Sequence, residues 1–415
     1  MHKLSLFAKP LALVPFLLAA CGGGSDATTA TTASSPAVTS TPSSTSTNIP
    51  TVSPTPTLTP TPAGGAVAPR AVTLNKSLAA PWGMAFLPNG RLLVSLKGGS
   101  MVILSPDGSS MEASLNNLPA VDSAGQGGLL DVALDPDFAT TSWVYWTYSE
   151  PGTGAESGLS GTAVARGQLI GNVMQNISVI YRQLPKVSGS GHFGSRLAFK
   201  DDKTLFVTLG ERQKGSPAQD LSTTLGKVIR INRDGTIPAG NPVLGNSARP
   251  EIWSYGHRNP QGAAIHPVTR ELWETEHGPQ GGDELNRIQA GANYGWPLVS
   301  YGCNYGDPVG DACRIGGGVH VSPYMEPVSY WAPTSIAPAG LVFYTGSGFP
   351  QWQGNAFFGA LAGAALWRVQ LSGTTEVARE RLFGELGERI RCVRQGPDGW
   401  LYLLTDSGKL IQIRD

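Results

Sequence analysis

The sequence contains few charged residues, few cysteines and no excess of either charge. Charged residues make up 14% of the 415, and the 30 basic side chains balance the 30 acidic ones. This balance gives no electrostatic reason to expect nucleic acid or an acidic membrane surface as a partner. Glycine and proline are abundant instead, at 53 and 32 residues. These values are typical of a turn-rich β protein and exclude a mainly helical one.

The first twenty residues have the features of an export signal. A short basic start precedes the apolar run 11–20, which is too short to cross a bilayer as a helix. The run ends in LAAC at 18–21, which resembles a bacterial lipobox. We therefore expect residues 1–20 to be a lipoprotein signal peptide, with Cys21 carrying the lipid. An ordinary signal peptide with a chance cysteine is the alternative. Gly22, in place of Asp, favours an anchor in the outer membrane, facing the periplasm.

The next segment differs in composition from everything that follows it. Residues 21–70 consist almost entirely of Ser, Thr, Ala, Pro and Gly, and they have few large apolar side chains to offset the entropy of ordering. We expect a disordered tether there and a folded domain over 71–415. Within that domain Cys303 and Cys313 flank a short polar loop, which favours a local disulfide. Cys392 lies in an apolar run typical of an inner strand, so a buried thiol is expected.

A strand–turn–strand unit recurs along the folded domain. It is clearest at 82–95, 194–208 and 391–404, where two apolar strands are joined by a turn rich in Asn, Asp or Gly. Repeated hairpins of this kind are typical of propeller blades. The length suits an all-β, six-bladed β-propeller with four strands per blade and long loops on one face. Seven smaller blades and a pair of β-sandwiches are the alternatives.

Three glycine-rich segments carry candidate functional residues. His192 directly precedes a predicted inner strand, where a neutral imidazole at the channel mouth can act as a general base. Arg258 and Asn259 offer a planar fork and a paired donor and acceptor. Residues 276–286 combine carboxylates with glycine turns, which suits Ca²⁺, although the spacing fits neither an EF-hand nor a zinc site. Taken singly, the His and Arg could equally be bonded to the backbone or to a blade carboxylate.

The motifs together resemble one enzyme family. SYGHRNPQGAAIHP at 254–267 and LWETEHGPQGGDELNRIQAGANYGWP at 272–297 are similar to the hallmark stretch of the soluble PQQ-dependent glucose/sorbosone and aldose sugar dehydrogenases. GQGGLLD, GHFGSRL, SIAPAGLVFYTG and ERIRCV match the same family, in the same order, from about residue 80 to the end. The resemblance implies a six-bladed propeller that holds PQQ and Ca²⁺. It also implies oxidation of the C1 hydroxyl of aldoses to lactones, with electrons leaving to a quinone or a redox protein.

The resemblance also implies roles for individual residues. His192 corresponds to the base that takes the anomeric proton, and Arg258 assists it at the cofactor. The carbonyls of Gly278 and Pro279 correspond to ligands of a cofactor-bound Ca²⁺, which would act as a Lewis acid. Glu284 and Tyr294 correspond to a second, structural Ca²⁺ site. The other cofactor-binding positions are Gln126, Asn259, Tyr305, Trp331, Arg389 and Arg391, and the last two share one strand face because their spacing is i, i+2.

One position departs from the family pattern. Ala362 stands where the family often has a lysine, so one cationic partner of a PQQ carboxylate is missing. Weaker cofactor binding, or compensation by an arginine such as Arg368, is the expected consequence. Ala362 also favours the main alternative, a non-enzymatic surface propeller that binds glycan or protein. A Ca²⁺-dependent hydrolase such as a lactonase would need carboxylates converging on the channel, whereas Glu276 and Glu284 are expected in one loop.

Overall fold

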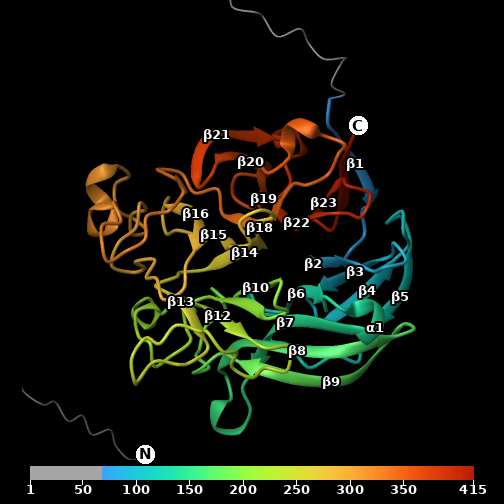
Figure 1. The fold of residues 1–415 in the computed structure, drawn as a ribbon, viewed down its shortest axis with the longest axis horizontal. Coiled ribbons are helices and arrows are strands. Elements are labelled where there is room, and N and C mark those ends of the chain that lie inside the picture. The colour runs from blue at the N-terminus through green and yellow to red at the C-terminus, as the bar shows by residue number, and fades with distance from the viewer. Residues whose placement is uncertain (1–67) are drawn as a thin grey trace, which may run out of the picture. The chain divides into compact units, whose positions relative to one another are not determined.

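The computed structural model describes residues 68–415, which form six antiparallel four-stranded sheets arranged around a central axis (Figure 1). The predicted six-bladed propeller is confirmed. Blade 1 contains β2 (Pro81–Phe86), β3 (Leu92–Leu96), β4 (Ser100–Leu104) and β5 (Met111–Leu115), and blade 2 contains β6 (Leu129–Leu134), β7 (Trp143–Pro151), β8 (Ser160–Ile170) and β9 (Val173–Arg182). Blade 3 contains β10 (Gly194–Phe199), β11 (Leu205–Leu209), β12 (Lys227–Ile231) and β13 (Ile252–Tyr255), and blade 4 contains β14 (Pro260–Ile265), β15 (Leu272–Glu276), β16 (Asp283–Ile288) and β17 (Ser329–Trp331). Blade 5 contains β18 (Pro338–Phe343), β19 (Ala356–Ala360), β20 (Ala365–Ser372) and β21 (Thr375–Leu382).

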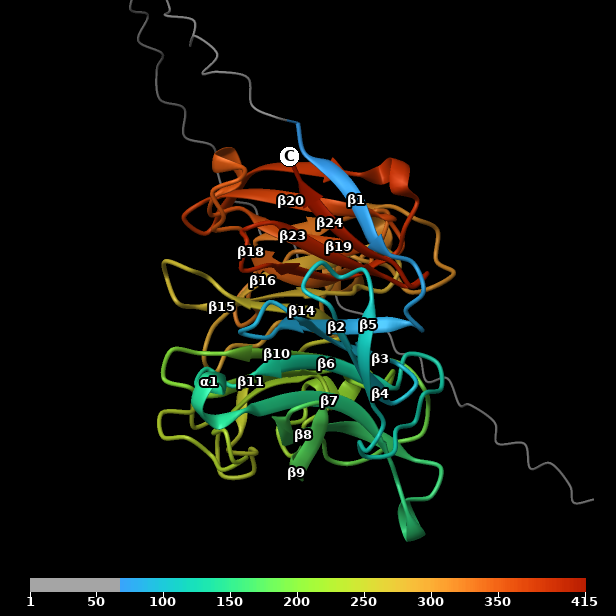
Figure 2. The same cartoon turned by 90° about the vertical axis from the view of Figure 1, so that its right-hand side faces the viewer.

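The sixth blade is assembled from both ends of the folded domain. Its strands are β22 (Ile390–Gln395), β23 (Leu401–Thr405), β24 (Leu410–Arg414) and β1 (Arg70–Asn75), in that order from the axis outwards. Figure 2 shows β1 beside β24, with which it pairs antiparallel from Arg70 opposite Arg414. This pairing closes the ring, because the first strand of the domain completes the last sheet and leaves no gap between the blades.

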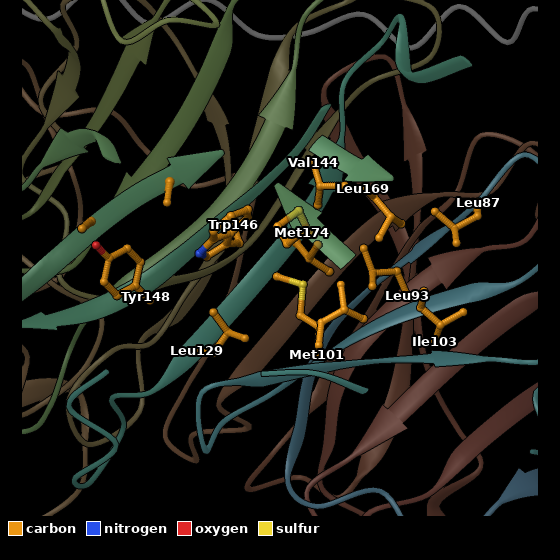
Figure 3. Close-up of a cluster of buried hydrophobic side chains, with 14 residues drawn as sticks. Leu87, Leu93, Met101, Ile103, Leu129, Val144, Trp146, Tyr148, Leu169 and Met174 are labelled. Atoms are coloured by element: carbon orange, nitrogen blue, oxygen red, sulfur yellow. The ribbon is translucent and has the colours of Figure 1, made fainter. Parts of the chain in front are cut away.

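Hydrophobic side chains fill the space between neighbouring blades. Between blades 1 and 2, for example, Leu93 and Met101 of the first pack against Leu129 and Trp146 of the second (Figure 3). All four are at most 1% exposed. Alternate residues along each strand contribute to such clusters because successive side chains point to opposite faces of a sheet. Burial on both sheet faces explains why the strands read as apolar runs with little alternation.

The strand order places two kinds of connection on one face of the ring. Because the strands are antiparallel, the turns from second to third strands lie at the same end as the passages from one blade to the next. We call this end the upper face. The predicted long loops are only partly on it. The connections 232–251 and 289–328 both start from the opposite end, and the second of them extends to the upper face, where Cys303 pairs with Gln280.

The cysteines of the folded domain lie as expected. Cys303 and Cys313 form a disulfide, and Cys392 is a fully buried free thiol on β22.

The predicted signal peptide, the predicted lipidated Cys21 and most of the tether lie outside the described residues. Over 68–415, no helix has the length and apolar character needed to cross a membrane. The one α-helix there, α1, covers Phe138–Thr141.

Candidate active site

Residues from several blades converge on a cavity at the upper face. The cavity has a volume of about 520 Å³. Its walls come from the segments that precede β6, β10, β14 and β18, from the turns β15–β16 and β19–β20, and from Tyr305 in the connection between β16 and β17. Seven of the positions singled out in the sequence line it: Gln126, His192, Arg258, Gly278, Pro279, Tyr305 and Ala362. The ring therefore assembles on one surface residues that are far apart in the chain.

His192 forms a close pair with a carboxylate that the sequence analysis missed. Its Nδ1 lies 2.5 Å from Oε1 of Glu211, a residue that is 1% exposed. The backbone N–H of Gly215 donates to Oε2 of Glu211 at 2.7 Å and holds the carboxylate in place. With Nδ1 protonated and donating to Glu211, Nε2 is left as the basic nitrogen. Burial, and the nearby charge of Arg258, lower the pKa of His192, so its imidazole is neutral near pH 7.

The loop that carries His192 is held in a strained conformation by a buried arginine. His192 has a φ of 51°, in the left-handed region that residues with a Cβ seldom adopt. Nε of Arg212 donates to the carbonyl of Gly191 at 2.9 Å, and its Nη groups donate to the carbonyls of Gly189 and Ser160. The guanidinium also stacks on the ring of the neighbouring Phe193, 3.7 Å from its centroid. The amide of Gln126 adds a further contact, since its oxygen accepts from the N–H of His192 at 2.8 Å.

Arg258 projects into the cavity, whereas its neighbour Asn259 lies beneath it. Nη1 of Arg258 donates to the carbonyl of Gly278 at 2.7 Å, and Nη2 donates to the hydroxyl of Tyr305 at 3.3 Å. Asn259 is fully buried and does not line the cavity. Its Nδ2 lies 3.4 Å from Nδ1 of His277, whose Nε2 in turn lies 3.0 Å from a backbone carbonyl. Burial and nearby arginines hold the pKa of His277 well below its usual range. Asn259 therefore fixes a second neutral histidine in the cavity wall.

A second, smaller cavity of about 280 Å³ adjoins the first through Gln126, which lines both. Arg389 and Arg391 line this smaller cavity together with Lys97 and Asp406. Nε of each arginine lies 3.0 Å from a carboxylate oxygen of Asp406, so the two guanidinium groups share one counter-charge. Four cationic side chains thus face the two cavities, counting Arg258 of the larger one.

Two residues named in the sequence analysis lie away from these cavities. Trp331 packs in the hydrophobic cluster of blades 4 and 5, where its ring is 5.4 Å from that of Phe358. Arg368 lies on β20 and forms an ion pair at 3.2 Å with Glu380 of β21, the outermost strand of the blade. Arg368 therefore does not compensate for the missing lysine at Ala362. Sequence position could not reveal either fact, since both depend on which face of a blade a side chain occupies.

A buried acidic cluster lies inside blade 4. Glu274 and Glu276 alternate along β15, and their partners across the sheet are Asn286 and Glu284 on β16. The expectation that Glu276 and Glu284 share a loop is therefore wrong, because they face each other on adjacent strands. His257 completes the group, with Nδ1 3.3 Å from Oε2 of Glu276 and 3.6 Å from Oε1 of Glu274. All five residues are at most 5% exposed.

This acidic cluster has the composition of a site for a hard cation. Burial and mutual repulsion raise the pKa of Glu274 to about 7 and that of Glu284 well above its usual value. Oε2 of Glu274, Oε2 of Glu276 and Oδ1 of Asn286 have no hydrogen-bond partner among the described residues. Ligand atoms of His257, Glu274 and Glu276 lie within 4.8 Å of one another. Orphaned oxygens and uncompensated negative charge are what a bound divalent cation would satisfy.

The structure places Tyr294 beside the acidic cluster without directing its hydroxyl into it. The ring stacks on His257 at 4.7 Å between centroids, and the hydroxyl donates to the carbonyl of Arg287 at 2.6 Å. A backbone N–H also donates to this hydroxyl. The phenol group is thus fully engaged, and Tyr294 contributes to the cluster through the packing of its ring.

The charges lining the two upper cavities suit an anionic cofactor of the kind that the sequence resemblance implies. The positive side chains outnumber the two lining carboxylates, Asp283 and Asp406. Nε of Arg258 is buried and has no hydrogen-bond partner among the described residues. A buried guanidinium N–H without an acceptor is costly, and an oxygen atom of a ligand would satisfy it. The donor set therefore suits a ligand with several carboxylate and carbonyl oxygens.

Several known proteins are similar to this chain in both sequence and fold. The chain is 43% identical over 346 residues to aldose sugar dehydrogenase YliI of Escherichia coli, covering 82% of this chain and 91% of that protein. The crystal structure of the E. coli aldose sugar dehydrogenase in the apo-form superposes with a TM-score of 0.77 at 41% identity, covering 83% of this chain and 99% of that one. The PQQ-bound aldose sugar dehydrogenase of Streptomyces coelicolor superposes with a TM-score of 0.69 at 28% identity, covering 84% and 98%.

The family model described as glucose/sorbosone dehydrogenase matches residues 78–412, which is nearly all of the folded domain. With the propeller, the ordered motifs and the paired cavities, this match identifies the chain as an oxidoreductase that belongs to the PQQ-dependent glucose/sorbosone dehydrogenase family.

Proposed function

We propose that this protein oxidises the C1 hydroxyl of aldose sugars to lactones, with PQQ bound across the two upper cavities. The observation that carries the proposal is the pairing of a neutral His192 with Glu211 in the wall of a cation-rich cavity. A propeller that only bound a glycan or a partner protein would have no use for a buried, oriented base. The names of the E. coli and S. coelicolor relatives support an aldose as the substrate class.

His192 carries the proton-transfer step of this mechanism. Oxidation of the C1 hydroxyl removes a proton from oxygen and a hydride from carbon, and bound PQQ supplies the two-electron acceptor. Nε2 of His192 takes the proton, because Nδ1 is occupied by Glu211. The imidazolium that forms is stabilised by the Glu211 carboxylate at 2.5 Å. Gln126 and Arg212 hold the histidine loop, so the base stays aimed at the cavity.

Arg258 and the two arginines of the smaller cavity would bind the cofactor. Arg258 lines the larger cavity, and its buried Nε lacks a hydrogen-bond partner among the described residues. Arg389 and Arg391 offer further donors while Asp406 orients them. Guanidinium groups suit carboxylates because two parallel N–H donors match two oxygens.

We also propose that the protein binds Ca²⁺ at two places. At the cofactor side, the carbonyl of Gly278 already accepts a hydrogen bond from Arg258, and a cation bound there with the carbonyl of Pro279 would replace that contact. There Ca²⁺ would act as a Lewis acid on a cofactor oxygen. The acidic cluster, with Glu284, would hold the second ion in a structural role, since the orphaned oxygens of Glu274, Glu276 and Asn286 match the ligands that Ca²⁺ prefers.

A reconstitution experiment tests the function. Protein treated with EDTA would be titrated with PQQ and Ca²⁺, and dye reduction would be measured with a series of aldoses. We expect one PQQ per chain, activity that depends on both additions, and lactone as the product. His192→Ala should still bind PQQ, yet it should lose at least roughly a hundredfold in kcat, the usual contribution of a general base. A wild-type chain that binds no PQQ would refute the proposal.

Finally, we propose that the enzyme is held at the outer membrane by a lipid on Cys21 and delivers its electrons to a quinone or redox protein of the cell envelope. The lipobox-like LAAC sequence at 18–21 supports this proposal. Expression of the full chain and of Cys21→Ala, followed by detergent phase separation, would test it. The wild type should enter the detergent phase and the variant should not.

A further inference from the structure

Ala362 leaves the cofactor cavity without the lysine that the family often has, and the structure offers another cation for the same role. Ala362 lies in the turn between β19 and β20, the second and third strands of blade 5. The equivalent turn of blade 1 joins β3 to β4 and begins with Lys97. Since every blade has the same strand order, such turns all lie at the upper face, around the same axis. Blade 6, with Arg389 and Arg391, stands between these two turns.

Lys97 has no counter-charge of its own. It lines the smaller cavity together with Arg389 and Arg391, but those two arginines share Asp406. Over residues 68–415, Lys97 takes part in no ion pair, and its Nζ donates only to the backbone carbonyl of Ser123, at 3.0 Å. An ammonium group with a single neutral acceptor retains capacity for an anionic one, because it carries three donors.

The position of the Lys97 side chain is set by its neighbours. Its backbone N–H donates to Ala80 at 3.0 Å, and its carbonyl accepts from Leu129 at 3.1 Å, so the turn is tied to both flanking segments. A Cβ on Gly128 would lie 2.6 Å from Cγ of Lys97 and 2.3 Å from its carbonyl oxygen. Glycine at 128 therefore leaves the space through which the aliphatic part of the lysine runs beside the cavity.

We propose that Lys97 is a cofactor-binding residue that pairs with a PQQ carboxylate and replaces, from blade 1, the cation that Ala362 does not supply in blade 5. This inference rests on the proposed function, because it takes PQQ as the ligand of the two cavities. In this arrangement Arg389 and Arg391 keep their ion pairs with Asp406. A tricarboxylate ligand would then meet Lys97, Arg389 and Arg391 around the smaller cavity.

Equilibrium binding of PQQ to the apo-protein tests the inference without relying on activity. Titrations followed by tryptophan fluorescence or calorimetry would compare wild type, Lys97→Met, Lys97→Arg and the double variant Lys97→Met/Ala362→Lys. Lys97→Met keeps the aliphatic stem but removes the charge. The substitution should raise the Kd for PQQ by roughly tenfold or more, because it removes a charge-assisted hydrogen bond. It should also weaken the salt dependence of Kd. Lys97→Arg should stay within a fewfold of wild type, and the double variant should recover most of the affinity.

The matched control is Lys200→Met, which removes a lysine from the β10–β11 turn on the opposite face of the ring. It should leave Kd unchanged. The melting temperature of each apo-protein would show that the variants fold, and Lys97→Met should melt as the wild type does. A Kd for Lys97→Met within twofold of wild type would overturn the inference while leaving the proposed function intact. If wild type itself bound no PQQ, the proposed function would fail first.

Discussion

Replacing Glu211 by glutamine would test the His192 pair most directly. The change keeps the shape of the side chain but removes the negative charge 2.5 Å from Nδ1 of His192. A hydrogen bond to a charged partner contributes roughly 1.5–3 kcal/mol, and in the proposed mechanism this one would stabilise the imidazolium formed as the proton leaves the sugar. If the proposed mechanism holds, we expect kcat to fall by roughly ten- to a hundredfold, since each 1.36 kcal/mol is a factor of ten in rate.

The pH dependence separates this explanation from general damage. Burial and Arg258 lower the pKa of His192, whereas the hydrogen bond that His192 donates to Glu211 raises it. Without the carboxylate the pKa falls further, so the neutral base persists to lower pH. The acid limb of the kcat/KM profile should move to lower pH even though the rate is reduced.

The assay is steady-state dye reduction at saturating PQQ over a range of pH, with Glu380→Gln as the control. Glu380 carries the same functional group, but it lies on the outermost strand of blade 5 and pairs with Arg368. A kcat for Glu211→Gln within threefold of wild type, or an acid limb that moves to higher pH, would refute the reasoning. PQQ affinity should not change, because Glu211 does not line the cavity.

Three further predictions concern stability. Removal of Ca²⁺ by EDTA should lower the melting temperature of the wild type in differential scanning fluorimetry, and Glu284→Gln should abolish most of this shift. A shift of equal size in wild type and variant would argue against the acidic cluster as an ion site. Asp131→Asn should destabilise the protein by roughly 3–5 kcal/mol in urea unfolding, because it leaves the charge of Arg196, 3.2 Å away and fully buried, without its partner. Cys303→Ser should cost up to about 3 kcal/mol, the loop entropy released when its bond to Cys313 across a separation of 10 residues is lost. Equal melting temperatures for wild type and Cys303→Ser under oxidising conditions would contradict the expected loss of stability.

The blades could be predicted from the sequence because their signals are local. Hairpins such as 82–95 contain both strands and the turn that joins them, so the pattern is complete within about fifteen residues. The observed β2 and β3 match that unit within a residue or two at each end. The candidate positions around His192 and Arg258 were likewise visible, since each is embedded in a motif that resembles a known family.

Partners from different blades could not be predicted in this way. Glu211 is different, because it follows β11 in the same hairpin as His192, with Gly194 opposite Leu209, so the register of the predicted hairpin could have revealed this pair. Lys97 shares a cavity with Arg391 although nearly the whole domain separates them in the chain. Trp331 was misplaced for the related reason that its side chain faces the neighbouring blade and not the cavity.

The sequence by itself therefore determined the fold class, the number of blades and the family, because strand patterns and turn chemistry act between neighbours in the chain. The tertiary structure alone decided which charges from different blades meet. It paired Arg196 of β10 with Asp131 of β6, placed His257 beside the glutamates of β15, and left Lys97 facing the smaller upper cavity without a counter-ion. The physical reason is that electrostatic interactions depend on distance through space, and the distances between blades are set only when the blades pack around one axis.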